Sequence, residues 1–119
     1  RVVTVAAPTT LRSGREALVR LLGEGADTDA VFCSSDLLAL GVLTEARVQG
    51  LRVPQQLAVI GFGDLQFAAD LDPALSTVRI KGDAIGRQAA QFIVDRVEGR
   101  EVPQRVIDIG FSIVERSSG

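Results

Sequence analysis

Two short apolar runs do most to restrict the fold of this chain. Ala30 to Cys33 reads AVFC and Leu57 to Phe62 reads LAVIGF, and neither run contains a charged side chain. Uninterrupted runs of this length are typical of strands that are buried on both faces of a parallel sheet. Parallel neighbours need a crossover connection, which is usually a helix. The sequence therefore predicts an α/β fold in which a parallel sheet is flanked by helices.

The segment before the first run supplies a further strand and a crossover helix. Val2–Ala7 is apolar and β-branched, which predicts a strand. An apolar stripe then predicts a helix from Thr10 to about residue 22. Ser13 is an alternative first residue of this helix, because a glutamate follows it at the spacing of a capping box.

The rest of the chain continues the alternation of helices and strands. Asp36 is expected to cap a helix over Asp36–Gln49 that is apolar on almost every side, so more than one of its sides should be covered. A strand is predicted at Ser76–Ile80, and Asp83 is expected to open another helix with an apolar stripe. Two short strands are predicted within residues 105–117.

Composition excludes several classes of function. The chain has 119 residues, which suits one domain, and its thirteen Lys and Arg residues are scattered without the cluster that nucleic-acid binding needs. There is no His, so neither catalytic residues nor a cofactor are predicted. No apolar run reaches the roughly 18 residues of a membrane-spanning helix. The lone Cys33 is interpreted as a small buried hydrophobe, and the absence of disulfides favours a cytoplasmic location.

Polar residues directly follow each of the first three predicted strands. The carboxyl ends of parallel strands meet at one edge of a sheet, and ligands bind there. The candidate ligand-binding residues at this edge are Thr9, Ser35, Asp36, Gly63 and Asp64. For Thr9, Ser35 and Asp36 the alternative role is helix capping, which we expect to be the main role of Asp36. Asp64, Asp70 and Asp72 could bind Mg²⁺ or Ca²⁺, but an acidic surface loop is the favoured interpretation and no metal site is predicted.

Several spaced motifs carry a resemblance to a known family. They are Ser35-Asp36, Ala39-Leu40-Gly41, Gly50-Leu51-Arg52-Val53-Pro54, Gly61-Phe62-Gly63-Asp64 and Pro73-Ala74-Leu75-Ser76-Thr77-Val78. In this order the motifs resemble the lactose-repressor/galactose-repressor (LacI/GalR) family of bacterial transcription regulators. The GFGD motif and the tail DIGFSIVER are similar to the gluconate-utilisation repressor branch of that family.

The resemblance implies a two-lobed effector-binding domain of the type I periplasmic-binding-protein-like fold, of which this chain is the incomplete C-terminal portion. Residues 1–76 are expected in the second lobe, residues 77–110 return to the absent first lobe, and residues 111–119 form the closing strand. A helix-turn-helix DNA-binding head is expected to precede the chain. The helix from Asp36 is implied to form a homodimer interface through Leu38, Val42, Glu45 and Ala46.

The function that follows from this resemblance is a cytoplasmic, dimeric regulator that senses a small molecule and changes its affinity for operator DNA. It is expected to be a repressor of sugar or sugar-acid utilisation and not an enzyme. The alternative is a periplasmic sugar-binding component of a transporter, because the lobes share a fold. An α/β enzyme comes third, since a catalytic His is missing.

Two departures from the family pattern bear on the effector. Gly63 stands where the family has an aspartate that binds sugar hydroxyls, and Ser35 stands where it has asparagine. A carboxylate at position 63 would repel an acidic ligand, so glycine favours a sugar acid such as gluconate. This argument expects the Gly63 N–H to be available as a donor and Asp64 to point toward the loop that follows it.

Overall fold

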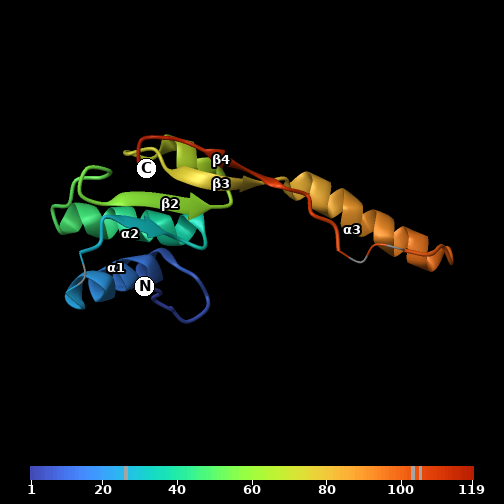
Figure 1. Cartoon of the computed structure of the whole chain (residues 1–119), viewed down its shortest axis with the longest axis horizontal. Coiled ribbons are helices and arrows are strands. Elements are labelled where there is room, and N and C mark those ends of the chain that lie inside the picture. Colours follow the sequence, from blue (N-terminus) through green and yellow to red (C-terminus); the bar gives the residue numbers. More distant parts are fainter. Residues whose placement is uncertain (26, 103, 105) are drawn as a thin grey trace. The chain divides into compact units, whose positions relative to one another are not determined.

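The computed structural model describes residues 1–25, 27–102, 104 and 106–119. The chain divides into two compact units. The larger unit holds residues 1–79 and 113–119, and the smaller unit holds residues 80–112. Figure 1 shows the order of elements along the chain.

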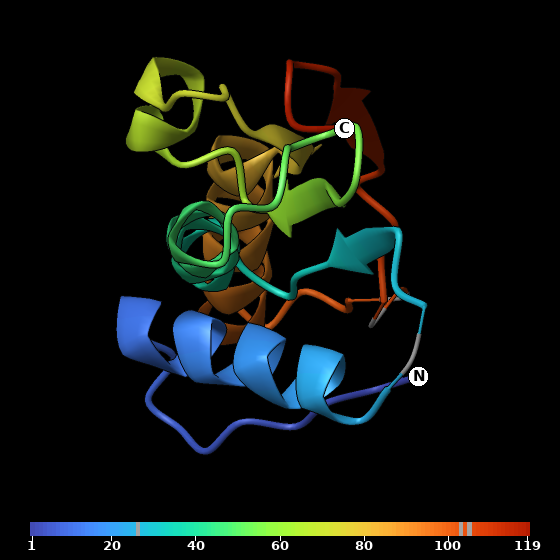
Figure 2. The same ribbon diagram turned by 90° about the vertical axis from the view of Figure 1, so that its left-hand side faces the viewer.

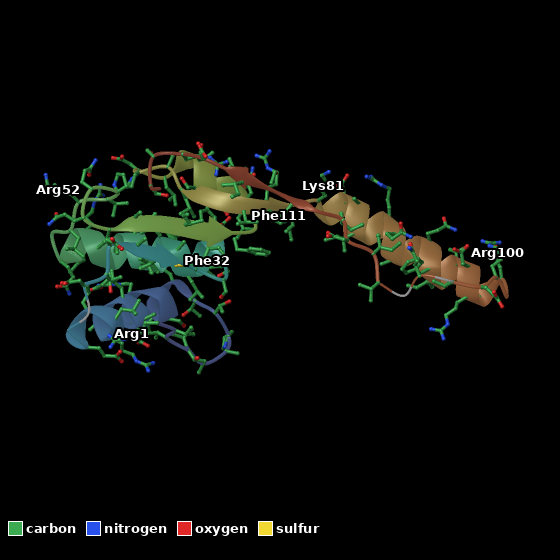
Figure 3. All side chains as sticks on the ribbon, in the orientation of Figure 1. Arg1, Phe32, Arg52, Lys81, Arg100 and Phe111 are labelled. Atoms are coloured by element: carbon green, nitrogen blue, oxygen red, sulfur yellow. The ribbon has the colours of Figure 1, made fainter. Side chains whose placement is uncertain are left out.

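A four-stranded sheet has the order β1-β2-β3-β4, with strands at Ala30–Phe32 (β1), Ala58–Phe62 (β2), Ser76–Ile80 (β3) and Phe111–Val114 (β4). β1 pairs with β2 in parallel, with Ala30 opposite Ala58, and β2 pairs with β3 in parallel, with Ile60 opposite Ser76. The α/β class and the first three of these strands are therefore confirmed. β1 is one of the two edge strands, and Phe32 is exposed, so the prediction that this run is buried on both faces is wrong (Figure 3).

Hydroxyl caps begin both helices of the larger unit. Helix α1 spans Leu11–Gly23, and the Thr10 Oγ1 accepts a hydrogen bond from the Ser13 N–H at 3.1 Å. The alternative start of this helix at Ser13 is thus wrong. Helix α2 spans Asp36–Val48, and its cap is Ser35, whose Oγ accepts from the Leu38 N–H at 3.2 Å. The prediction that Asp36 is the capping residue is wrong as well.

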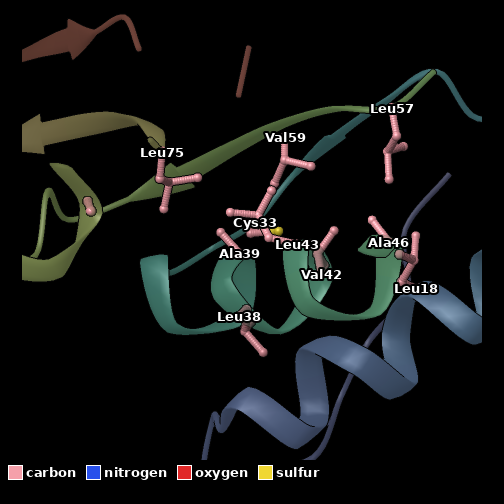
Figure 4. Close-up of a cluster of buried hydrophobic side chains, with 11 residues drawn as sticks. Leu18, Cys33, Leu38, Ala39, Val42, Leu43, Ala46, Leu57, Val59 and Leu75 are labelled. Atoms are coloured by element: carbon pink, nitrogen blue, oxygen red, sulfur yellow. The ribbon is translucent and has the colours of Figure 1, made fainter. Parts of the chain in front are cut away.

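Helix α2 lies between α1 and the sheet, which explains why it has almost no polar face (Figure 2). Figure 4 shows the core on both sides of it, with Val59 and Leu75 on the strand side and Leu18 on the α1 side. The two helices touch through glycines. An ideal Cβ on Gly41 would overlap the carbonyl oxygen of Leu11 and lie 2.8 Å from the Cα of Gly14.

Two predicted strands are not found. Val2–Ala7 forms no strand, and instead the Thr4 carbonyl accepts from the Arg20 Nη1 at 3.2 Å. A strand requires backbone pairing with a neighbour, and this segment is held by a side chain of α1. Within residues 105–117 the described residues form one strand, β4, not two; Arg105 lies outside the described residues. The acidic loop after β2 contains a short 3₁₀ helix, η1, at Gln66–Asp70.

The smaller unit consists of helix α3, Gly82–Val97, and the segment that follows it. The helix begins one residue before the predicted Asp83. No residue of α3 is buried, and its predicted apolar stripe is exposed at Ile85, Ile93 and Val97. Among the described residues, no helix combines the length and the apolar character that crossing a membrane requires.

Candidate functional site

The larger unit brings polar residues together at the carboxyl ends of β1, β2 and β3. We call this place the rim and define it by Ser34–Asp36 after β1, Gly63–Asp64 after β2, and Arg79 near the end of β3. Four of the five predicted ligand-binding residues lie in these segments. The fifth, Thr9, is exposed just before the cap of α1, and it does not follow a strand in the structure.

Asp36 is a fully buried carboxylate with a partner on each oxygen. Its Oδ1 accepts from the Thr77 hydroxyl at 2.6 Å, and its Oδ2 accepts from the Leu65 N–H at 2.6 Å. These bonds join the start of α2 to β3 and to the turn after β2. Position 61 has to be glycine, because a Cβ there would overlap the Asp36 Oδ1. Asp36 therefore holds the rim together from inside.

Ser35 is only partly buried, and Ser34 beside it is exposed. The bond that caps α2 uses the Ser35 Oγ as an acceptor, so its hydroxyl hydrogen remains a possible donor to another group. Capping, the alternative role given for Ser35, is thus found, whereas Asp36 bonds across the fold and does not cap the helix. That either side chain touches an effector stays a prediction.

Gly63 forms the turn at the end of β2. Its φ of 127° lies in a region that side-chain-bearing residues rarely adopt. A Cβ at this position would be 3.8 Å from the Asp36 Oδ2, so there is space for one. The Gly63 N–H donates to the Val78 carbonyl at 2.8 Å. The expectation that this N–H is available to a ligand is therefore wrong.

Asp64 follows with a left-handed φ of 52°, which aspartate tolerates better than most residues. Its carboxylate binds two arginines: Oδ2 accepts from the Arg79 Nε at 2.6 Å and Oδ1 from the Arg116 Nη2 at 2.8 Å. The expectation that Asp64 points toward the following loop is wrong. Burial raises the pKa of this carboxyl, but the hydrogen bonds and charges of Arg116 and Arg79 outweigh burial and lower the pKa below its ordinary value.

The lowered pKa predicts the acid sensitivity of the larger unit. A carboxyl whose folded-state pKa is lowered contributes stability above its unfolded-state pKa of about 4, and that contribution is lost as the pH falls through the folded-state pKa. We expect the free energy of unfolding to drop more steeply below about pH 4 in wild type than in Asp64→Asn. Urea unfolding at a series of pH values measures this; parallel curves for the two proteins would contradict it.

Arginines 79 and 116 were missed by reasoning from the sequence. Arg116 lies in the tail that resembles the closing strand of the family, and its side chain is only 17% exposed. Its Nη1 also donates to the Leu75 carbonyl at 2.7 Å. Next to it, the buried Ser118 Oγ accepts from the Ser76 N–H at 2.8 Å and donates to the Val59 carbonyl at 2.7 Å. The tail thus links Val59 of β2 to Ser76 at the start of β3.

The four residues implied to form a dimer interface are buried within the single chain. They are Leu38, Val42, Glu45 and Ala46. Glu45 lies against α1, where its Oε2 accepts from the Arg15 Nε at 2.8 Å. Hydrogen bonds from Gln49 and Arg15 lower the pKa of the Glu45 carboxyl. The structure gives these residues the role of packing α2 inside the chain; a contact with a second copy stays a prediction.

Within the described residues, the structure indicates neither a nucleophilic thiol at Cys33 nor a metal site in the acidic loop. The thiol is buried, as predicted, and burial followed by the charge of Asp36 raises its pKa to about 12. Among the described residues, no cluster of three or more His, Cys, Asp or Glu side chains could hold a metal ion.

A cavity of about 590 Å³ lies between residues 1–5, α1 and β1, and it is lined by Ser34 but by none of the predicted ligand residues.

Comparison with known proteins decides the family. The profile of the periplasmic binding protein-like domain matches residues 1–119. The chain belongs to this family. Within the family its relatives are LacI-type regulators: it is 40% identical over 111 residues to the HTH-type transcriptional regulator GntR of Pseudomonas aeruginosa, covering 93% of this chain and 32% of that protein. Over 93 residues it is 39% identical to the HTH-type transcriptional repressor CytR of Escherichia coli, covering 78% and 27%.

Solved structures agree with this placement. The crystal structure of the transcription regulator GntR from Chromobacterium violaceum matches with a TM-score of 0.84 and 40% identity, covering 93% of this chain and 41% of that one. The chain thus has a partial LacI-type, periplasmic-binding-protein-like fold. It spans about a third of the length of its curated relatives. The named relatives are transcription regulators, not enzymes.

Proposed function

We propose that the chain is the C-terminal part of the effector-binding domain of a LacI-type repressor that acts in the cytoplasm and responds to a sugar or a sugar acid. The observation that carries this proposal is the similarity to a GntR regulator over 93% of the chain. A homodimer and operator DNA are the proposed partners, with the DNA bound by a helix-turn-helix head outside this chain.

The division of the chain supports the proposed lobes. Residues 1–76 belong to the second lobe, residues 77–110 return to the first lobe, and residues 111–119 form the closing strand. The boundaries of the compact units lie between residues 79 and 80 and between residues 112 and 113, close to these limits. The exposed apolar stripe of α3 is what a helix shows when the lobe that it packs against is not present.

The rim is the proposed effector site of this lobe. Ser35 offers a hydroxyl hydrogen, Gly63 leaves space near the Asp36 carboxylate, and Thr9 is a further candidate outside the rim. Asp36 and Asp64 shape the rim through their bonds within the chain. No uncompensated carboxylate stands at the surface of the rim, because Asp64 is bound by two arginines. This arrangement favours an acidic ligand such as gluconate over a neutral sugar.

A gel-shift titration of the full-length regulator tests the proposal. We expect binding to a pseudo-palindromic operator that changes when sodium gluconate is added, because an effector shifts the population between two states with different operator affinity. Glucose at the same concentration is the neutral control. No preference for any operator sequence, with either compound, would overturn the repressor function.

The second candidate is a periplasmic sugar-binding component of a transporter, and the observation that favours it is the family to which the chain belongs. The two candidates differ in what precedes the effector-binding domain. A helix-turn-helix there indicates a regulator, whereas a signal peptide indicates a transporter component.

A further inference from the structure

The chain passes from one compact unit to the other twice. Near each passage an arginine binds the same side chain, that of Asp64. The outgoing passage lies between Arg79 and Ile80, in β3, and the returning passage lies between Ser112 and Ile113, in β4. Arg79 is the last residue before the outgoing passage. Arg116 follows closely after the returning one. The guanidinium groups of both arginines bind the carboxylate of Asp64, at 2.6 and 2.8 Å.

Asp64 is itself fixed in the turn that forms the rim. It directly follows Gly63, whose N–H donates to the Val78 carbonyl at 2.8 Å, and its own N–H donates to the Thr77 Oγ1 at 3.4 Å. The same Thr77 hydroxyl donates to the Asp36 carboxylate. A movement of the turn at Gly63 therefore moves the anchor of both connecting strands.

The hydrogen bonds of the Asp64 carboxylate are strong, because they join charged groups and are shielded from solvent. Its side chain is 12% exposed and that of Arg116 is 17% exposed, so this pair is shielded from solvent. Hydrogen bonds between charged groups are roughly twice as strong as neutral ones. Without the carboxylate, Arg116 would be left as a nearly buried charge close to the Arg79 cation, which is costly and repulsive.

We propose that Asp64 is a positioning residue that fastens both connecting strands to the rim and so transmits a change in the rim to the connections between the units. The part that concerns transmission rests on the proposed effector function. The fastening itself is a property of this chain alone. Asp64 thereby gains a role other than contact with an effector.

Hydrogen exchange of the 119-residue chain, measured by mass spectrometry, tests the fastening. In Asp64→Asn we expect amide exchange to rise about tenfold in both connecting segments, residues 77–80 in β3 and residues 113–116 at and just after the end of β4, with no change in α2. Arg79→Gln should loosen mainly residues 77–80 and Arg116→Gln mainly residues 113–116, because each removes one of the two ties. Asp72→Asn is the matched control, since that carboxylate is almost fully exposed and 3.9 Å from its partner Arg47.

The pattern of exchange decides the outcome. Faster exchange in only one strand after Asp64→Asn, or an equal rise throughout the larger unit, would overturn the proposal. The transmission is tested in the full-length regulator, where Asp64→Asn should keep operator binding and lose most of the response to sodium gluconate. An unchanged response overturns transmission. A wild type that ignores gluconate counts against the proposed effector, and the exchange result still decides whether Asp64 fastens both strands.

Discussion

Replacing Gly41 by alanine is expected to lower the free energy of unfolding of the larger unit by about 2–3 kcal/mol. A Cβ on Gly41 would overlap the Leu11 carbonyl oxygen and approach the Gly14 Cα to 2.8 Å, so α1 and α2 have to move apart. Backbone atoms cannot turn away as a flexible side chain can. The separation opens the packing around Leu18, and this loss exceeds the gain of about 1 kcal/mol that alanine brings to a helix interior.

Urea unfolding followed by circular dichroism measures this change, because the chain has neither Trp nor Tyr for fluorescence. Gly23→Ala is the matched control: it lies at the end of α1, where a Cβ would meet nothing within 4 Å. Gly14→Ala should cost about as much as Gly41→Ala, and the double variant less than the sum, since one separation of the helices accommodates both methyl groups. Equal stability of Gly41→Ala and Gly23→Ala would show that the two helices do not touch at this point.

The glycine contact illustrates what a sequence can and cannot reveal about this fold. The apolar runs at 30–33 and 57–62 predicted the positions of β1 and β2 correctly, but burial on both faces was wrong for β1, where Ala30 and Phe32 are exposed. The absence of a polar face on α2 correctly indicated that it is covered on several sides. The residue that lets α1 approach so closely could not be identified, since a glycine in a helix looks the same whether or not another backbone lies against it.

The strand predicted at Val2–Ala7 failed for a related reason. A β-branched, apolar segment can occupy a strand, but a strand forms only with a partner whose backbone groups it can bind. Composition reports the first condition and says nothing about the second. In the structure the Thr4 carbonyl is bound by Arg20 instead.

Four of the five predicted residues lie at the rim, whereas Thr9 does not, and the hydrogen bonds within the rim were not predicted. Topology places the residues after β1 and β2 together, which is why Ser35, Asp36, Gly63 and Asp64 could be selected. Ser and Asp are equally good caps, so the sequence could not assign their roles. The choice depends on Thr77 and the Leu65 N–H, which bind Asp36 across the fold. Arg116 was missed because its partner Asp64 lies 52 positions away along the chain.

Introducing a carboxylate at Gly63 is expected to weaken binding of a sugar acid far more than a neutral change at the same position. A Cβ fits at this position because the Asp36 Oδ2 would be 3.8 Å away, so an aspartate would place a carboxylate at the surface of the rim, where the ligand is proposed to bind. A ligand carboxylate about 4 Å from this aspartate would be repelled by about 4 kcal/mol at an effective dielectric constant near 20. After partial screening we expect Gly63→Asp to lose on the order of a hundredfold in affinity for gluconate, or about 3 kcal/mol.

The controls separate charge from backbone strain. Gly63 has a φ of 127°, so any side chain at this position strains the turn. Gly63→Ala carries this strain without a polar group, and Gly63→Asn has the shape of aspartate without its charge. Calorimetry with sodium gluconate on the full-length regulator should give a large loss for aspartate and smaller, similar losses for alanine and asparagine. Three equal losses, or a wild type that prefers glucose, would show that charge at the rim does not select the effector; Gly63 would then be required only for the turn that carries Asp64 to its two arginines.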